Sequence, residues 1–226
     1  MKNVAIVLAG GNGSRMKSNV PKQYMEIEGR TVLFYSLNQF QDCSFINQIV
    51  LVARKEDVEE CKEKYSFPKI THVVPGGSER YESVMNGLEC IKEDGYVFIH
   101  DGARPCITID ALNKLYEDVI QYKASVLAVK SKDTVRISDE EGNAVMTPSR
   151  NNVWLIQTPQ AFDIELIKKA YELLKEIGTN KTITDDAMVA EEFLNTKIHL
   201  TEGEYTNIKI TTPEDLWTVS DFFKKN

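Results

Sequence analysis

The sequence predicts an α/β protein built around a mostly parallel sheet, and three observations lead to this prediction. Five short apolar runs recur along the 226 residues, and such runs are typical of strands buried on both faces. Amphipathic stretches separate them, which is the pattern of strand–helix–strand units with right-handed crossovers. No linker-like tract or internal repeat divides the chain, so we expect one domain over residues 1–226.

The five predicted strands are β-branched and nearly continuous, and the first begins almost at the amino terminus. The residues in the middle of each run have apolar neighbours before and after them in the sequence. This pattern is expected for strands in the middle layer of a layered protein. The runs lie at residues 4–8, 49–52, 71–74, 96–99 and 125–129.

Helical periodicity occupies much of the sequence between and after these strands. The last helix has a clear start signal, since Thr212 can serve as its N-cap and Pro213 as its first residue. Three further helices are predicted from apolar residues that recur every three or four positions, within 84–91, 112–120 and 164–177.

One segment, residues 133–152, breaks the strand–helix alternation. It reads as a strand, an acidic turn at 139–143 and a second strand, which predicts a β-hairpin inserted into the α/β chain. A hairpin of this length is poorly stable alone. We therefore expect it to leave the main body as a lid, or as an arm that meets another subunit.

Composition and charge argue against several function classes. Asp and Glu number 34 against 27 Lys and Arg, a formal net charge of −7, which disfavours a general nucleic-acid binder. No run approaches the ~20 apolar residues of a membrane span and no signal-peptide flanks occur, so we expect a cytoplasmic protein without a membrane partner. The cysteines and histidines are scattered, which disfavours a disulfide framework or a metal site built from them.

A glycine-rich loop follows the first predicted strand and is the first candidate site. Ala9, Gly10, Gly11 and Gly13 allow backbone N–H groups to approach an anion closely, and Arg15 adds a forked donor. A dinucleotide fingerprint would need glycine or alanine at position 16, which is methionine, and a P-loop would need a Gly-Lys pair. The loop is therefore a candidate phosphate site, with a plain tight turn as the alternative.

Charged residues near two predicted strand ends add to this candidate site. Lys22 lies close enough in sequence for Lys22 and Arg15 to face one phosphate chain, although a solvated surface lysine is the alternative. Asp101 directly follows the fourth strand, where ligands of open α/β sheets bind. It is either an acid near a metal–phosphate complex or the partner of Arg104 in a turn.

Four other segments carry weaker signals. Glycines and hydroxyls at 76–83 precede a predicted helix, whose first N–H groups can accept anions or base carbonyls. Residues 157–162 and 182–186 are rich in hydroxyls and amides. Lys209 alternates with isoleucines in a short predicted strand, 207–210, so its side chain lies on the opposite face, which is a site or solvent.

Taken in order, these motifs resemble the 2-C-methyl-D-erythritol 4-phosphate cytidylyltransferases over nearly the whole chain, from Val4 to Leu216. The resemblance implies a Rossmann-like three-layer α/β/α nucleotidyltransferase sandwich with a protruding β-arm, working as a homodimer. It also implies that CTP and the polyol phosphate give a CDP-alcohol and pyrophosphate in non-mevalonate isoprenoid synthesis. The motifs are Gly-Asn-Gly-Ser-Arg-Met, Pro-Lys-Gln-Tyr, Gly-Gly-Ser-Glu-Arg-Tyr-Glu-Ser-Val, His-Asp-Gly-Ala-Arg-Pro, Asp-Thr-Val, Arg-Asn-Asn-Val-Trp, Gln-Thr-Pro-Gln, Thr-Asp-Asp and Asn-Ile-Lys-Ile-Thr.

The resemblance also assigns roles to individual positions. It places catalytic cations on the two substrates, nucleotide-binding residues around CTP, and a magnesium ion held mainly by phosphate oxygens and water with Asp101 as its protein contact. Arg15 and Lys22 match residues on the triphosphate, and Arg150 and Lys209 match those on the acceptor phosphate. The nucleotide-binding set is Ala9, Gly10, Gly11, Gly13, Gly77, Ser83 and Asp101, with Gly77 and Ser83 reading cytosine, and the acceptor set is Thr134, Arg150, Thr158, Thr184 and Lys209.

Two alternatives remain open at this point. The start Leu8-Ala9-Gly10-Gly11 and the segment 203–207 are closer to the sister ribitol-5-phosphate cytidylyltransferases, whereas Ala-Arg-Pro after Gly102 favours methylerythritol phosphate. Gly102 itself stands where the family usually has alanine. A non-catalytic CTP sensor would not need the acceptor cations Arg150 and Lys209. A dehydrogenase is excluded by the missing third glycine.

Overall fold

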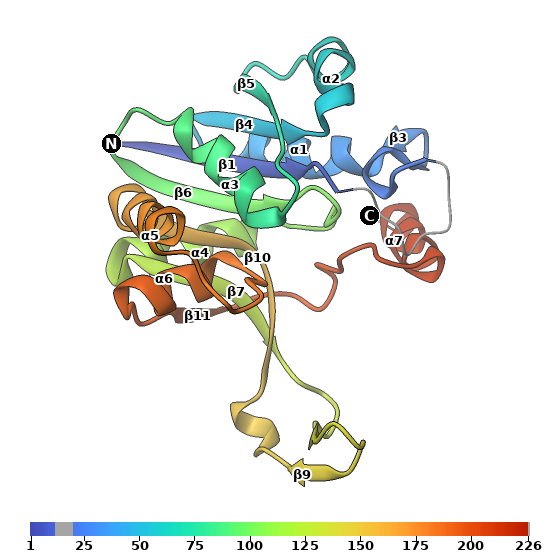
Figure 1. Cartoon of the computed structure of the whole chain (residues 1–226). Coiled ribbons are helices and arrows are strands. Elements are labelled where there is room, and N and C mark those ends of the chain that lie inside the picture. Colours follow the sequence, from blue (N-terminus) through green and yellow to red (C-terminus); the bar gives the residue numbers. More distant parts are fainter. Residues whose placement is uncertain (12–19, 226) are drawn as a thin grey trace.

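A seven-stranded sheet forms the centre of the part of the chain that the structure, a computed structural model, describes: residues 1–11 and 20–225 (Figure 1). The strand order is β11-β7-β10-β6-β1-β4-β5. Only β10 runs antiparallel to its neighbours within this sheet, so the prediction of a mostly parallel sheet is confirmed. The strands are β1 (Lys2–Ala9), β4 (Gln48–Ala53), β5 (Ile70–Pro75), β6 (Gly95–Asp101), β7 (Ala124–Lys130), β10 (Trp154–Asp163) and β11 (His199–Glu202).

Helices cover both faces of the sheet and give the predicted three layers (Figure 1). Alternate residues of a strand point to opposite faces, and in β1 Ala5 and Val7 face one helical layer while Val4 and Ile6 face the other. The first layer holds α1 (Val32–Asp42), α2 (Val58–Lys64) and α4 (Ile109–Tyr122), and the second holds α3 (Arg80–Glu89), α5 (Ile164–Ile177) and α6 (Asp186–Leu194).

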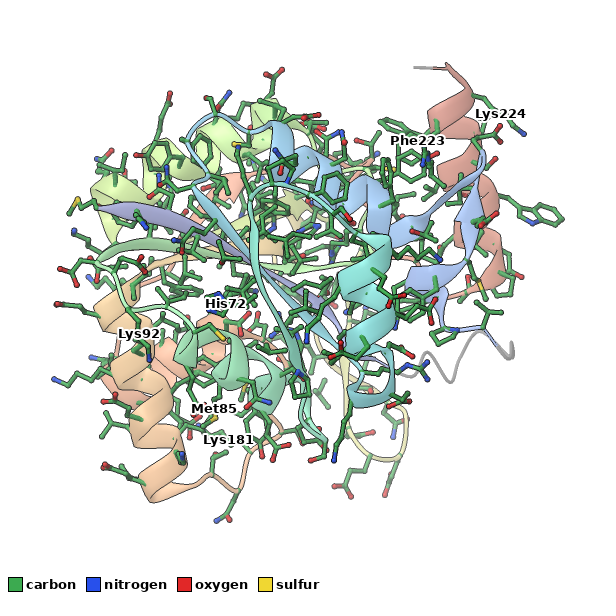
Figure 2. All side chains as sticks on the ribbon, turned by 90° about the horizontal axis from the view of Figure 1, so that it is seen from above. His72, Met85, Lys92, Lys181, Phe223 and Lys224 are labelled. Carbon is green, nitrogen blue, oxygen red and sulfur yellow. The ribbon has the colours of Figure 1, made fainter. Side chains whose placement is uncertain are left out.

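The last helix, α7 (Pro213–Lys225), begins at the predicted proline and packs at one end of the sheet. Its Phe223 ring stacks on Tyr35 of α1 at a centroid distance of 4.0 Å (Figure 2). A small hairpin of β2 (Glu26–Ile27) and β3 (Arg30–Thr31) lies beside it. None of the helices in the described residues is long and apolar enough to cross a membrane.

The predicted hairpin at 133–152 is confirmed as an arm between β7 and β10. It extends away from the sheet (yellow in Figure 1) and carries a short ladder of β8 (Ile137–Ser138) and β9 (Ala144–Met146). The Asp139 carboxylate accepts hydrogen bonds from two backbone N–H groups of the turn, which fixes its shape. Val145 and Met146 are 62% and 52% exposed, so the arm offers apolar surface that its own chain does not cover.

Candidate active site

Two adjoining hollows lie beyond the carboxyl ends of the parallel strands β1 and β6. These strands end together, because Leu8 is paired with Asp101. The first hollow, of about 220 Å³, is bordered by the glycine-rich loop, Lys22, the start of α3 and Asp101. The second, of about 310 Å³, extends along β10 to the start of α6. Arg80, Asp101 and Lys209 border both, so the two hollows form one groove at the sheet edge that the sequence predicts.

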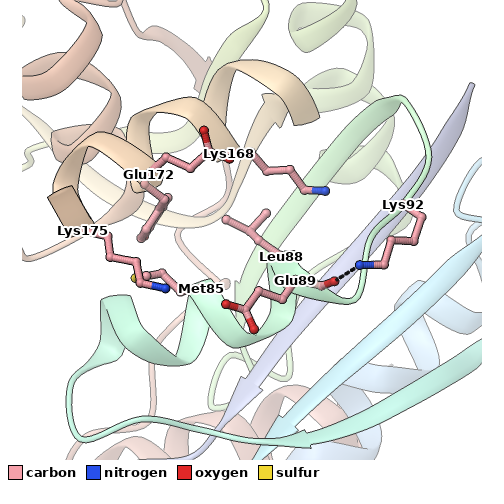
Figure 3. A pocket seen from close by; sticks show the side chains of 8 residues that line it. Met85, Leu88, Glu89, Lys92, Lys168, Glu172 and Lys175 are labelled. Carbon is pink, nitrogen blue, oxygen red and sulfur yellow. Dashed lines mark hydrogen bonds between the residues drawn. The ribbon is translucent and has the colours of Figure 1, made fainter.

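A larger hollow of about 520 Å³ lies elsewhere, between α3 and α5 (Figure 3). Its walls carry Met85 and Leu88 from α3 and Lys168, Glu172 and Lys175 from α5. None of the predicted substrate-binding residues that the structure describes borders it. The groove at the strand ends is therefore the candidate active site, since most of the predicted residues that the structure describes meet there.

The start of the glycine-rich loop, residues 9–11, is held at the groove by a buried glutamine. Gln23, only 2% exposed, donates from its side-chain amide to the carbonyls of Ala9 and Gly11 at 2.7 and 3.0 Å. Its neighbour Lys22 borders the first hollow together with Ala9, Gly10 and Gly11. The predicted site residues Gly13 and Arg15 lie outside the described residues.

The start of α3 forms the wall facing the glycine-rich loop. The Ser83 hydroxyl accepts from the Gly77 N–H at 3.1 Å and donates to the Glu79 carbonyl at 3.3 Å, so it shapes the turn before the helix. A side chain at position 76 would displace this hydroxyl, because its Cβ atom would lie 2.8 Å from the Ser83 oxygen. The structure thus brings Gly77 and Ser83 into the first hollow, where cytosine reading stays a prediction.

Asp101 stands at the junction of the two hollows among several cations. Among the described residues, the Lys209 ammonium lies 2.7 Å from its carboxylate, the Arg80 Nε 3.4 Å and the Arg104 Nε 4.0 Å. Burial acts to raise the pKa of Asp101, but these positive charges outweigh it and hold the pKa well below its usual range. Asp186, the first residue of α6, also pairs with Arg80, so two carboxylates face three cations and these groups keep a surplus of one positive charge that suits phosphate groups.

Lys209 reaches this junction from an irregular segment, so the prediction that residues 207–210 form a strand is wrong. The segment is held by other contacts: the Ile210 N–H donates to the Ala103 carbonyl at 2.9 Å, and Arg104 donates to the Asn207 carbonyl at 2.8 Å. Because these partners lie on the loop after β6 rather than on a neighbouring strand, no ladder forms. The Lys209 ammonium pairs with Asp101, while its side chain stays 35% exposed.

Thr158 borders the second hollow, but its hydroxyl is engaged in holding Asp101. It accepts from the Asp101 N–H at 3.1 Å and lies 3.1 Å from the Nδ1 of His100. Burial lowers the pKa of His100 from 6.5 to about 4, so this imidazole is neutral at pH 7. Thr184 borders the same hollow.

Two predicted acceptor residues, Thr134 and Arg150, are not brought to the groove of their own chain. Both are exposed on the arm, and Arg150 donates to the Lys132 carbonyl at 3.3 Å. Neither borders the two hollows. Within one chain, the acceptor set is therefore incomplete.

Arg80 is the site residue that sequence reasoning missed. Its guanidinium donates twice to the Asp186 carboxylate, at 3.0 and 2.8 Å, and borders both hollows. A signal was present, because a cation in the first turn of a helix is disfavoured by the helix dipole. An arginine at the first position of α3 thus indicates a role other than helix stability.

The groove offers few ligands for a metal ion. The described residues contain no group of three or more His, Cys, Asp or Glu side chains placed to hold one. Asp101 is the acid at the junction, and its carboxylate already faces Lys209 and Arg80. A magnesium ion fits this groove when phosphate oxygens of a bound substrate and water supply most of its ligands.

Comparison with known proteins gives consistent matches along the chain. The family model described as 2-C-methyl-D-erythritol 4-phosphate cytidylyltransferase matches residues 3–225. A protein of that name from Lachnospira eligens is 47% identical over 98% of this chain and 99% of its own, and one from Lachnoclostridium phytofermentans is 49% identical over 95% and 93%.

Solved structures agree with these matches. A 4-diphosphocytidyl-2C-methyl-D-erythritol synthase from Anaerococcus prevotii superimposes with a TM-score of 0.85 at 36% identity, over 99% of this chain and 96% of that one. The 2-C-methyl-D-erythritol 4-phosphate cytidylyltransferase from Francisella tularensis gives a TM-score of 0.81 at 31% identity, over 97% and 98%.

Proposed function

The chain belongs to the 2-C-methyl-D-erythritol 4-phosphate cytidylyltransferase family, and from that premise we propose which of its residues carry out the transfer. It is a nucleotidyltransferase that joins CTP and 2-C-methyl-D-erythritol 4-phosphate into a CDP-alcohol and releases pyrophosphate. The relatives do not favour ribitol 5-phosphate as the acceptor, although the loop 8–11 is closer to that sister group. A cytoplasmic location suits an enzyme that uses CTP.

The observation that supports the assignment of residues is the positive junction around Asp101. Two anionic substrates must meet against their mutual repulsion, and the groove has one hollow on each side of this junction. CTP occupies the hollow lined by the glycine-rich loop and the start of α3. The acceptor phosphate occupies the hollow along β10, next to Lys209 and Arg104. Holding the two in contact removes much of the entropic barrier.

The chemistry needs no general base. A phosphate monoester has a second pKa of about 6 and is largely a dianion at neutral pH. One of its oxygens attacks the α-phosphorus of CTP, a new P–O bond forms, and the bond to the departing pyrophosphate breaks. Lys22 and Arg15 stabilise the charge that develops on the triphosphate, and Lys209 and Arg150 orient the acceptor. His100 takes no proton in this scheme, since it is buried.

Pyrophosphate release tests this assignment. The protein is incubated with CTP and Mg²⁺ together with methylerythritol phosphate, ribitol 5-phosphate or no acceptor. Release with methylerythritol phosphate at a kcat/KM well above that for ribitol 5-phosphate is expected. Preference for ribitol 5-phosphate would overturn the acceptor. CTP binding with no release from either acceptor would instead make the chain a nucleotide sensor.

Magnesium enters this scheme with the nucleotide. It supplies Lewis-acid charge neutralisation on the triphosphate, and Asp101 is the protein group that contacts it or its water. Because the chain itself presents few ligands, the free protein should bind Mg²⁺ only weakly. Equilibrium dialysis with and without CTP measures this difference. Stoichiometric metal retained by the nucleotide-free protein after dialysis against a chelator would contradict the scheme.

The arm completes the acceptor site across a homodimer. Arg150 and Thr134 are exposed outside their own groove, and the arm carries uncovered apolar residues such as Val145. Two arms that pack about a two-fold axis can each place Arg150 at the partner's groove. Lys22 of one subunit, on the triphosphate, and Arg150 of the other, on the acceptor phosphate, then serve one active site.

Mixing two inactive variants tests this composite site. Lys22→Ala and Arg150→Ala homodimers are unfolded and refolded together in equal amounts. About half of the dimers are then mixed, and each holds one doubly damaged and one intact site, so activity returns to roughly a quarter of the wild-type value. If both residues served the same subunit's site, mixed dimers would regain no activity.

A further inference from the structure

We propose that Tyr171 and Asp186 are positioning residues of this enzyme, which hold the Arg80 guanidinium at the junction of the two hollows. The inference rests on the proposed function, since Arg80 borders the two hollows in which the substrates are proposed to lie. Tyr171 lies in the middle of α5, Asp186 is the first residue of α6 and Arg80 is the first residue of α3. All three helices pack on the same face of the sheet.

The Asp186 carboxylate is held from several sides. Arg80 donates to its two oxygens at 3.0 and 2.8 Å, and the Tyr171 hydroxyl donates to Oδ1 at 2.6 Å. The side-chain oxygen of Gln160 on β10 accepts from the N–H groups of Asp186 and Ala187 at 3.0 and 2.9 Å, which fixes the start of α6. Asp186 is fully buried, so water does not compete for these contacts.

This arrangement is costly to build for stability alone. Removing a carboxylate and most of an arginine side chain from water carries a desolvation penalty, and a well-packed apolar pair is often at least as stable. An ion pair with a fully buried carboxylate does fix geometry, because a bidentate arginine–carboxylate contact admits one orientation of the guanidinium plane. The Asp186–Tyr171 pair therefore contributes a fixed orientation of the Arg80 guanidinium.

The orientation matters because Arg80 borders both hollows. With two of its nitrogens engaged by Asp186, its Nε points to Asp101 at 3.4 Å. Burial acts to lower the pKa of Arg80, but the charges of Asp186 and Asp101 raise it above its ordinary value, so the guanidinium stays charged. A guanidinium freed from Asp186 keeps this charge but can turn toward Asp101, where it competes with Lys209. Loss of the pair therefore misplaces a charge rather than removing it.

The expected kinetic effect follows from that distinction. The groove remains positive, so ground-state attraction of the anionic substrates, and hence KM, changes less than about threefold. Alignment in the transition state is lost, and a misplacement of about 1 Å can cost ~100-fold in rate. We expect kcat to fall about tenfold in Tyr171→Phe and further in Asp186→Asn.

Tyr65→Phe is a matched control for Tyr171→Phe. Both tyrosines are 3% exposed, and each loses one buried hydroxyl contact without a change in ring packing. The Tyr65 hydroxyl bonds to that of Thr31 at 2.9 Å and belongs to the opposite face of the sheet. Similar decreases in melting temperature are expected for the two variants, with a lower kcat in Tyr171→Phe only.

A second measurement does not depend on turnover. In protein labelled with ¹⁵N-arginine, exchange of the Arg80 Nε–H with water is followed by NMR. Exchange about tenfold faster in Tyr171→Phe and Asp186→Asn than in the wild type and Tyr65→Phe is expected. Wild-type kcat together with wild-type exchange in Tyr171→Phe would overturn the inference. The result for Tyr171→Phe is sufficient to test the inference even if Asp186→Asn fails to fold. A wild-type protein that releases no pyrophosphate would instead overturn the proposed function, while the exchange measurement still tests the positioning of Arg80.

Discussion

His100 should make the stability of this protein depend on pH in a way that one substitution removes. The imidazole is fully buried, packs edge-on against Phe40, and joins two parts of the site. Its Nε2 lies 3.1 Å from the Arg104 carbonyl, and its Nδ1 lies 3.1 Å from the Thr158 hydroxyl. A neutral ring protonated on Nε2 satisfies both neighbours, as donor to the carbonyl and acceptor from the hydroxyl.

The direction and size of this pH dependence follow from the pKa of His100, which burial lowers from 6.5 to about 4 in the folded protein. As the pH falls below 6.5, the unfolded chain takes up the proton first, so folding becomes less favourable. The contribution of His100 is thus present above pH 6.5 and is lost as the pH falls toward 4. Between pH 7.5 and pH 5 the loss amounts to about 2 kcal/mol of unfolding free energy.

Urea unfolding of the wild type and His100→Gln at several pH values measures the contribution of His100 to the unfolding free energy. Other titrating groups are shared by the two proteins, so the difference in unfolding free energy isolates His100. At pH 7.5 the variant should be less stable by roughly 2 kcal/mol, because the two buried contacts are lost or distorted. The difference should shrink by about 2 kcal/mol at pH 5 and stay constant between pH 7.5 and 8.5. An equal difference at pH 5 and pH 7.5 would refute the reasoning.

Three further substitutions test other parts of the site and fold. Lys22→Ala should lower kcat by ~100-fold with an unchanged melting curve; near-normal turnover would make Lys22 a surface charge. Asn207→Ala should lower the free energy of unfolding in urea by roughly 2 kcal/mol and raise the KM for the acceptor severalfold. The reason is that the fully buried Asn207 amide donates to the Thr158 carbonyl at 2.9 Å and holds the segment before Lys209. Gly95→Ala should lower the free energy of unfolding by roughly 3 kcal/mol or more, since Gly95 has φ of +146° and a Cβ atom there would overlap the Lys2 carbonyl. A wild-type melting temperature would contradict this.

The strands and helices that the sequence predicts are those with an uninterrupted hydropathy pattern. The runs at 4–8 and 96–99 became β1 and β6, because each residue there meets core on one face or the other. β10 was not predicted as a strand, since Gln157, Thr158 and Gln160 interrupt its apolar character. These side chains are buried yet bonded to the loop after β11, to β6 and to α6, and only the folded chain supplies those partners.

The sequence by itself determined the layered fold, the arm and the position of the groove, because hydropathy periodicity and glycine-rich turns are local properties of the chain. It also placed Lys22 and Asp101 at the groove, since they lie at or near strand ends. Only the tertiary structure decided which charged side chains pair with one another. The Arg80–Asp186 contact spans 106 positions of the sequence, and Lys209 meets Asp101 only because its segment packs on the loop after β6. Charge pairing depends on distances between elements, and those distances exist only once the sheet and its two helical layers have packed.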